Sequence, residues 1–140
     1  MKVITFGTFD MFHVGHLNIL ERAKEYGHTL VVGVSSDALN YSKKGRYPIC
    51  NEQDRMRIIA SLSCVDEVFL EQSLELKADY LRQHGADILV MGDDWAGRFD
   101  QFNSICRVEY LPRTPAISTT QLIEVVQNLS TGGILDAKSA

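Results

Sequence analysis

Residues 7–16 constrain this chain more than any other stretch, because they join a strand pattern to a helix pattern through a glycine-bearing turn. They read G-T-F-D-M-F-H-V-G-H and follow the apolar run at residues 3–6. The N–H groups of a first helical turn, with the positive end of the helix dipole, attract anions. His13 and His16 are three positions apart, so one helical turn would let both donate to one phosphate. Gly15 has no Cβ and lets a ligand approach the backbone. The stretch therefore predicts a phosphate site.

The alternatives for the two histidines are a zinc pair or ordinary surface residues. A zinc site needs a third and a fourth ligand, and the remaining candidates show no ligand spacing: His28, His84, Cys50, Cys64 and Cys106. Neither G-x-G-x-x-G nor G-x-x-x-x-G-K-[ST] occurs in the chain. We therefore favour the phosphate interpretation.

Composition indicates one soluble globular domain. The 140 residues are 45% hydrophobic and 23% charged. We expect a cytoplasmic protein, since no apolar segment reaches the length of a membrane span and the start of the chain lacks signal-peptide features. Three cysteines without a C-x-x-C pattern argue against a disulfide framework or a redox motif. The net charge of −4 argues against non-specific nucleic-acid binding.

The pattern of apolar residues predicts alternating strands and helices, the hallmark of an α/β fold with a parallel sheet. The expected strands are 3–6, 29–35, 65–70, 87–91 and 107–111. The expected helices are 16–26, closed by Gly27, then 52–62, 74–84 and a last helix that Ser118-Thr119-Thr120 opens and that runs to 129. The domain would span residues 1–129, and residues 130–140 would form a flexible tail.

One polar segment and one arginine each have both a structural and a functional interpretation. Residues 36–51 are either a solvated charged loop or a mobile cationic loop, with Lys43, Lys44 and Arg46, that closes over a triphosphate. Arg55, near the start of the helix at 52–62, is either an anion contact or part of a surface ion pair with Glu52 or Asp54.

The segment before the last helix is the second candidate phosphate cradle. Ser118 and its two threonine neighbours are most simply a helix N-cap. With Arg113 close by in the sequence, the same helix start could also bind phosphate.

Taken together, four motifs resemble the glycerol-3-phosphate cytidylyltransferase family of the H-x-G-H nucleotidyltransferase superfamily. They are G-T-F-D-M-F-H-V-G-H, K-K-G-R, V-M-G-D-D-W-A-G-R-F-D and L-P-R-T-P-A-I-S-T-T, and the resemblance covers residues 1–128. It implies a doubly wound, Rossmann-like, five-stranded parallel sheet of order 3-2-1-4-5 in a single domain, and a homodimer. It also implies transfer of CMP from CTP to sn-glycerol 3-phosphate, giving CDP-glycerol and pyrophosphate for cell-surface polymers that contain glycerol phosphate.

The resemblance also implies roles for individual residues. The catalytic residues would be His13, His16, Lys43 and Lys44, and the acceptor phosphate would meet Lys43, Lys44, Arg55 and Lys77. Mg²⁺ would be held mainly by the CTP phosphates and not by protein ligands. The residues that bind CTP would be Thr8, Phe9, His13, Val14, Gly15, His16, Asp94, Arg113, Thr114, Pro115, Ala116, Ile117, Ser118, Thr119 and Thr120.

The chain departs from the family pattern at two places. Leu74 stands where the family commonly has a Trp, three residues before Lys77, and Pro115-Ala116 replaces the usual Glu-Gly. The first departure bears on the acceptor, so a cytidylyltransferase for another small phospho-alcohol is the alternative. A non-catalytic nucleotide sensor on the same scaffold is a further one.

Overall fold

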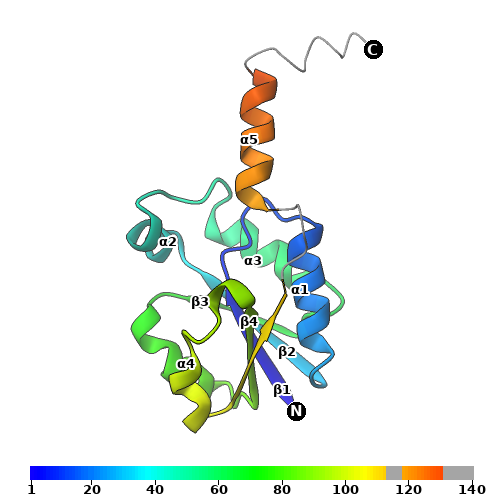
Figure 1. Cartoon of the computed structure of the whole chain (residues 1–140), viewed down its shortest axis with the longest axis vertical. Coiled ribbons are helices and arrows are strands. Elements are labelled where there is room, and N and C mark those ends of the chain that lie inside the picture. Colours follow the sequence, from blue (N-terminus) through cyan, green and yellow to red (C-terminus); the bar gives the residue numbers. More distant parts are fainter. Residues whose placement is uncertain (113–117, 131–140) are drawn as a thin grey trace.

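The computed structural model describes residues 1–112 and 118–130, which form one parallel five-stranded sheet flanked by helices (Figure 1). The strand order is β3-β2-β1-β4-β5, and every adjacent pair is parallel, which confirms the expected fold class. The strands are β1 (Lys2–Gly7), β2 (Thr29–Ser35), β3 (Glu67–Glu71), β4 (Ile88–Gly92) and β5 (Arg107–Leu111). The helices are α1 (Val14–Lys24), α2 (Asp37–Lys44), α3 (Glu52–Ala60), α4 (Lys77–Gln83) and α5 (Thr119–Ser130), with short 3-10 helices η1 (Leu74–Leu76), η2 (Asp93–Trp95) and η3 (Asp100–Ser104).

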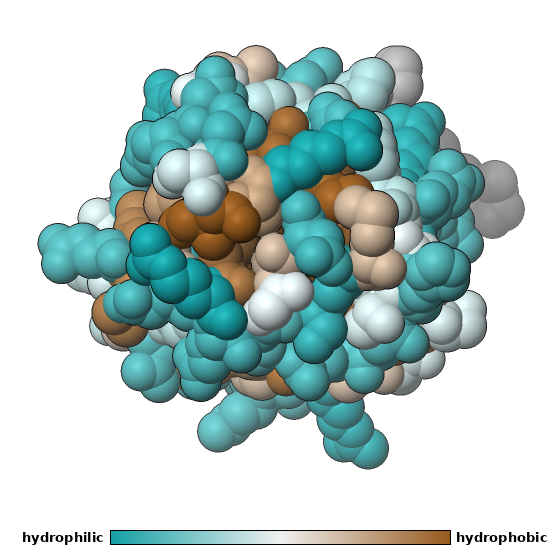
Figure 2. Space-filling view, turned by 90° about the horizontal axis from the view of Figure 1, so that it is seen from below, coloured by the Kyte–Doolittle hydropathy of each residue, from teal (hydrophilic) through white to brown (hydrophobic). Residues whose placement is uncertain are grey.

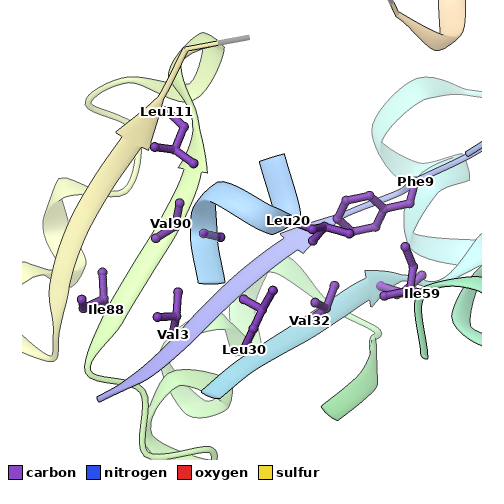
Figure 3. Packing of buried hydrophobic residues seen from close by; sticks show 11 residues of the cluster. Val3, Phe9, Leu20, Leu30, Val32, Ile59, Ile88, Val90 and Leu111 are labelled. Carbon is purple, nitrogen blue, oxygen red and sulfur yellow. The ribbon is translucent and has the colours of Figure 1, made fainter. Parts of the chain in front are cut away.

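Two hydrophobic clusters, one on each face of the sheet, explain the nearly continuous apolar runs in the central strands. In β1, Val3 packs into one cluster and Ile4 into the other, because successive side chains of a strand point to opposite faces. Leu20 of α1 and Ile59 of α3 complete the first cluster (Figure 3). Leu81 of α4 belongs to the second cluster. The sheet is therefore covered on both faces.

The main difference from the expected elements is α2, which occupies much of the segment predicted as a loop. The Ser36 hydroxyl caps this helix by accepting a hydrogen bond from the N–H of Leu39 (3.0 Å), and Gly45 ends it in the left-handed region with φ of 73°. Lys43 and Lys44 thus lie on the last turn of a helix, the favourable end of its dipole for a cation. The prediction of a loop was wrong because polar residues inside the helix hid these two end signals.

The ends of α1 also differ from the prediction. The helix begins at Val14, with His13 as its N-cap residue, and not near His16. It ends at Lys24, before Gly27. A Cβ at Gly27 would lie 2.5 Å from the carbonyl oxygen of Met1, so the glycine allows a close backbone approach and does not end the helix.

The last described helix, α5, extends away from the sheet at the end where the carboxyl ends of the strands lie (Figure 1). Seen from the other end, where the N-terminus lies, the surface is mostly hydrophilic, with hydrophobic residues in a limited area (Figure 2). Within residues 1–112 and 118–130, no helix combines the length and the apolar character needed to cross a membrane. The tail expected at 130–140 falls almost entirely outside the described residues.

Candidate functional site

A cavity of about 850 Å³ opens at the carboxyl ends of the strands, beside the switch point between β1 and β4 where doubly wound sheets bind ligands. Its lining contains five cationic side chains and three acidic ones, although the whole chain carries a net charge of −4. The cations are Lys43, Lys44, Arg46, Lys77 and Arg98, and the acidic residues are Asp10, Glu71 and Asp94. The cavity therefore concentrates positive charge and suits an anionic ligand.

The two histidines of the turn after β1 are held side by side at the start of α1. Their rings stack with centroids 3.9 Å apart. Nδ1 of His13 accepts a hydrogen bond from the N–H of Gly15 (3.0 Å), and Nδ1 of His16 accepts one from the N–H of His13 (3.2 Å). Because each Nδ1 is an acceptor, the neutral rings carry their protons on Nε2. Both Nε2–H groups are thus available as donors.

The hydroxyl of Thr119, the first residue of α5, lies where these two donors converge. Its oxygen is 3.3 Å from Nε2 of His13 and 3.5 Å from Nε2 of His16, and it donates to the carbonyl of Asp10 at 3.0 Å. One hydroxyl can donate once and accept twice, so the three contacts are mutually consistent. The point of convergence is a position where a phosphate oxygen could accept both N–H groups.

The electrostatic surroundings keep both imidazoles neutral near pH 7. Burial lowers the pKa of His13. For His16, burial and the neighbouring His13 lower the pKa to about 4, and Asp10 opposes this shift. Near pH 7 the pair therefore presents neutral N–H donors and not imidazolium charge.

The turn between β1 and α1 adopts unusual backbone angles that aim its side chains. Phe9 and Met11 have φ of 55° and 48°, in the left-handed region that non-glycine residues seldom occupy. A Cβ at Gly7 would lie 2.8 Å from the Phe9 ring, so the glycine allows this ring to pack closely against the backbone at Gly7. The carboxylate of Asp10 accepts hydrogen bonds from the N–H groups of Ile49 (2.8 Å) and Cys50 (2.9 Å), which tie the segment after α2 to the turn.

On the other side of the cavity, two lysines meet a buried carboxylate. Lys77 is 4% exposed, and its ammonium nitrogen lies 2.9 Å from Glu71 Oε2 and 3.9 Å from the centroid of the Phe6 ring. Lys43 donates to Ser35 Oγ (3.3 Å), which in turn donates to Glu71 Oε1 (3.3 Å). Burial lowers the pKa of both lysines, and the negative charge of Glu71 opposes that shift in each.

The structure does not bring Arg55 into the cavity, which corrects both interpretations of this residue. It is 1% exposed and donates four hydrogen bonds within the protein. Arg55 therefore does not form a surface ion pair with Glu52 or Asp54, and its guanidinium is not free to contact a phosphate. The acceptors are the carbonyls of Thr8, Ser35 and Cys50 and the carboxylate of Asp37. The guanidinium thus fastens the ends of β1 and β2 to α3.

The remaining expected residues fall into three groups. Most of those that the structure describes line the cavity: Thr8, Phe9, His13, Gly15, His16, Lys43, Lys44, Lys77, Asp94, Ser118, Thr119 and Thr120. Val14 is exposed and does not line it. Arg113, Thr114, Pro115, Ala116 and Ile117 lie outside the described residues.

Sequence reasoning missed several residues that line the cavity. Asn40 accepts a hydrogen bond from the Thr8 hydroxyl (2.7 Å) but belongs to the helix that was predicted as a loop. Ser35 and Glu71 are polar residues that end two apolar strands, and this position was the signal that could have revealed them. Trp95 and Arg98 also line the cavity, and both belong to the motif V-M-G-D-D-W-A-G-R-F-D that supported the resemblance.

Comparisons with known proteins agree with this geometry. A model of the cytidylyltransferase-like family matches residues 4–125. The glycerol-3-phosphate cytidylyltransferase of Bacillus subtilis is 44% identical over 128 residues, which are 91% of this chain and 98% of that protein. Its namesake from Staphylococcus aureus is 40% identical over 86% of this chain and 91% of its own length. Among solved structures, a lipopolysaccharide core biosynthesis protein from Thermoplasma volcanium matches with a TM-score of 0.69 and 27% identity, over 81% of this chain and 96% of that one.

Proposed function

The chain belongs to the cytidylyltransferase-like family, and we propose that it transfers CMP from CTP to sn-glycerol 3-phosphate, giving CDP-glycerol and pyrophosphate. The observation that carries the proposal is the convergence of two neutral Nε2–H donors, from His13 and His16, on one point of a cationic cavity. The product would serve the synthesis of cell-surface polymers that contain glycerol phosphate.

The chemistry of this reaction asks mainly for positioning and charge neutralisation. A phosphate oxygen of the acceptor attacks the α-phosphorus, the new P–O bond forms, and the bond to the bridging oxygen breaks as pyrophosphate leaves. The phosphate oxygen is already a nucleophile and needs no general base. His13 and His16 would donate to an α- or β-phosphate oxygen as its negative charge increases in the transition state. Lys43 and Lys44 would neutralise the phosphates as they approach each other.

The residues of the cavity fit Mg²⁺ held mainly by the nucleotide. Within the described part of the chain, no group of three or more His, Cys, Asp or Glu side chains could hold a metal. Both carboxylate oxygens of Asp10 already accept backbone N–H groups. We propose that Mg²⁺ takes its ligands chiefly from triphosphate oxygens and water, where it would offset the charge of the leaving pyrophosphate.

Pyrophosphate release tests the proposed nucleotide. With Mg²⁺ and glycerol 3-phosphate, we expect CTP to be used in strong preference to ATP, because a pocket built around one base edge leaves polar groups unpaired with another. Similar turnover of ATP and CTP would contradict the cytidylyl assignment. Binding of CTP without any pyrophosphate release, whichever phospho-alcohol is added, would favour the nucleotide sensor.

The acceptor is tested by a screen of phospho-alcohols with CTP. Leu74 lines the cavity and is 47% exposed, and it offers neither the broad face nor the N–H donor of the Trp that the family pattern has there. This favours another small polyol phosphate as the second candidate. If kcat/KM for glycerol 3-phosphate is about tenfold below that for another acceptor, a gap of about 1.4 kcal/mol, that other acceptor becomes the proposed substrate. The assignment as a cytidylyltransferase would not change.

We also propose that the protein is a cytoplasmic homodimer. Two-fold association is the commonest oligomer, and Val125 and Val126 on α5 are 50% and 54% exposed, which offers an apolar surface to a second copy. Light scattering tests the dimer: a mass of 15.7 kDa at micromolar concentration, with full activity, would refute it.

A further inference from the structure

Glu71, the last residue of β3, is a buried carboxylate that the phosphate chemistry above does not use. It is 1% exposed and lines the cavity. Its Oε1 accepts a hydrogen bond from the hydroxyl of Ser35, but no described residue gives Oε2 a hydrogen bond of good geometry. A buried charge without full hydrogen bonding destabilises a fold, so its presence calls for an explanation.

The contacts of Glu71 reach the two lysines that approach it from different helices. Lys77, at the start of α4, places its ammonium 2.9 Å from Oε2, between the rings of Phe6 (3.9 Å) and Phe99 (5.0 Å). Lys43, on the last turn of α2, reaches the other oxygen through the Ser35 hydroxyl. One carboxylate thus fixes the directions of two cations that line the same cavity.

Charge around this group is one-sided apart from Glu71. The charged side chains that act on Lys43 from α2, α3 and α4 are all cations: Lys44, Arg55 and Lys77. Glu71, from β3, is the anion that acts on both Lys43 and Lys77. Without Glu71, the half-buried ammonium of Lys43 and the buried ammonium of Lys77 would share a low-dielectric space, and proton loss from one of them would be favoured.

We propose that Glu71 is the positioning residue of the acceptor subsite, whose carboxylate holds Lys43 and Lys77 charged and directed at one phosphomonoester. The inference rests on the proposed function, since the phosphomonoester is the acceptor of that reaction. Glu71 itself does not touch the reacting atoms. It acts through the two lysines, so its loss weakens binding of the acceptor and leaves CTP binding nearly unchanged.

The substitution that tests this is Glu71→Gln, which keeps the size of the side chain and removes its charge. The matched control is Glu67→Gln at the other end of β3, where Glu67 lies 2.8 Å from His84, is half exposed and does not line the cavity. We expect Glu71→Gln to raise KM for glycerol 3-phosphate about tenfold or more, the scale of a lost charge-assisted contact, with KM for CTP within about twofold of wild type. Glu71→Asp keeps the charge and should lie between Glu71→Gln and wild type, whereas Glu67→Gln should match wild type.

A second measurement reads the lysine directly and needs no turnover. The ¹³Cε resonance of Lys77, identified by its loss in Lys77→Met, is titrated in the free protein. The pKa of Lys77 should be lower in Glu71→Gln than in wild type and unchanged in Glu67→Gln, and the rise of the acceptor KM with pH should begin at lower pH in Glu71→Gln. Should Glu71→Gln not fold, Glu71→Asp carries the same two readouts with smaller changes.

The possible outcomes separate this inference from the proposed function. An equal rise of both KM values, or a Lys77 titration that is the same in wild type and in the Glu71 variants, would overturn the positioning role. A wild-type protein that releases no pyrophosphate from CTP and glycerol 3-phosphate would refute the proposed function, while the lysine titration would still decide whether Glu71 sets the charge of Lys77.

Discussion

Replacing Arg55 with Met should remove the hydrogen bonds that link α3 to the ends of β1 and β2. The guanidinium donates from Nε to the carbonyl of Cys50 (2.9 Å) and from Nη1 to those of Thr8 (2.9 Å) and Ser35 (2.8 Å). Its Nη2 donates to Asp37 Oδ1 at 2.6 Å. Met fills a similar volume but donates nothing, so three carbonyls and one carboxylate lose a partner at once.

The expected loss of stability follows from these contacts. Four hydrogen bonds at about 0.5–1.5 kcal/mol each give about 2–6 kcal/mol. Removing one partner of a buried ion pair costs about 3–5 kcal/mol by itself, although the Asp37 side chain is 29% exposed and water can replace part of that contact. We therefore expect Arg55→Met to lower the free energy of unfolding by about 4 kcal/mol, which corresponds to roughly 12 °C in melting temperature for a domain of this size.

Urea denaturation followed by circular dichroism measures this change, with Arg57→Met as the control on the same helix. Arg57 is exposed, so its substitution should change the free energy of unfolding by less than about 0.5 kcal/mol. Arg55→Lys should lie between Met and wild type, because one ammonium cannot reach four acceptors arranged around a planar fork. The reasoning is refuted if Arg55→Met unfolds within about 1 kcal/mol of wild type. Loss of acceptor binding in such a stable variant would restore the phosphate role first expected for Arg55.

Three further predictions concern the histidine pair. His16→Ala should lower kcat by about two to three orders of magnitude with the fold intact, the scale of losing one transition-state donor; a well-folded variant within a few-fold of wild type would defeat this assignment. Because the pKa of His16 is about 4 in the folded protein and about 6.5 when unfolded, acid should destabilise the fold. The unfolded chain binds the proton first, so the free energy of unfolding should fall by up to about 3 kcal/mol from pH 6.5 to pH 4. His16→Gln should lose this part of the pH dependence in urea titrations at each pH, and an unchanged slope would contradict the buried neutral ring. Wild-type kcat should stay level from pH 6 to 8, whereas a role for imidazolium would make it fall over that range.

The sequence was most informative where local pattern and fold agree. The alternation of apolar strands with helices predicted all five strands, because strands buried on both faces leave nearly continuous apolar runs. The spacing of His13 and His16 predicted that they share one side of a helix start, and the stacked rings lie there. These features depend on neighbours in the sequence, so a single chain is enough to reveal them.

Contacts between distant segments could not be predicted in the same way. Arg55 looked like a cation on a helix surface because the carbonyls that surround it come from residues 8, 35 and 50. Glu71 directly follows the strand expected at 65–70 and had no predicted role, because its two lysines come from helices 28 residues back and six residues on. Burial at both positions is decided by packing of the whole domain, which no local pattern records.

The two sides of the cavity, a histidine half with His13 and His16 and a lysine half with Lys43 and Lys77, have different electrostatic properties. The reaction proposed for the site brings a phosphomonoester towards a triphosphate, so two anions that repel each other must meet. The histidine half offers neutral donors with fixed protons, which can favour charge that develops on one oxygen without holding the nucleotide too tightly beforehand. The lysine half offers full positive charges. Because burial lowers the pKa of Lys77, the nearby carboxylate of Glu71 is needed to keep this ammonium protonated. A chain of net charge −4 can therefore bind two anions, because what matters is the charge within a few ångströms of the phosphates and not the sum over the surface.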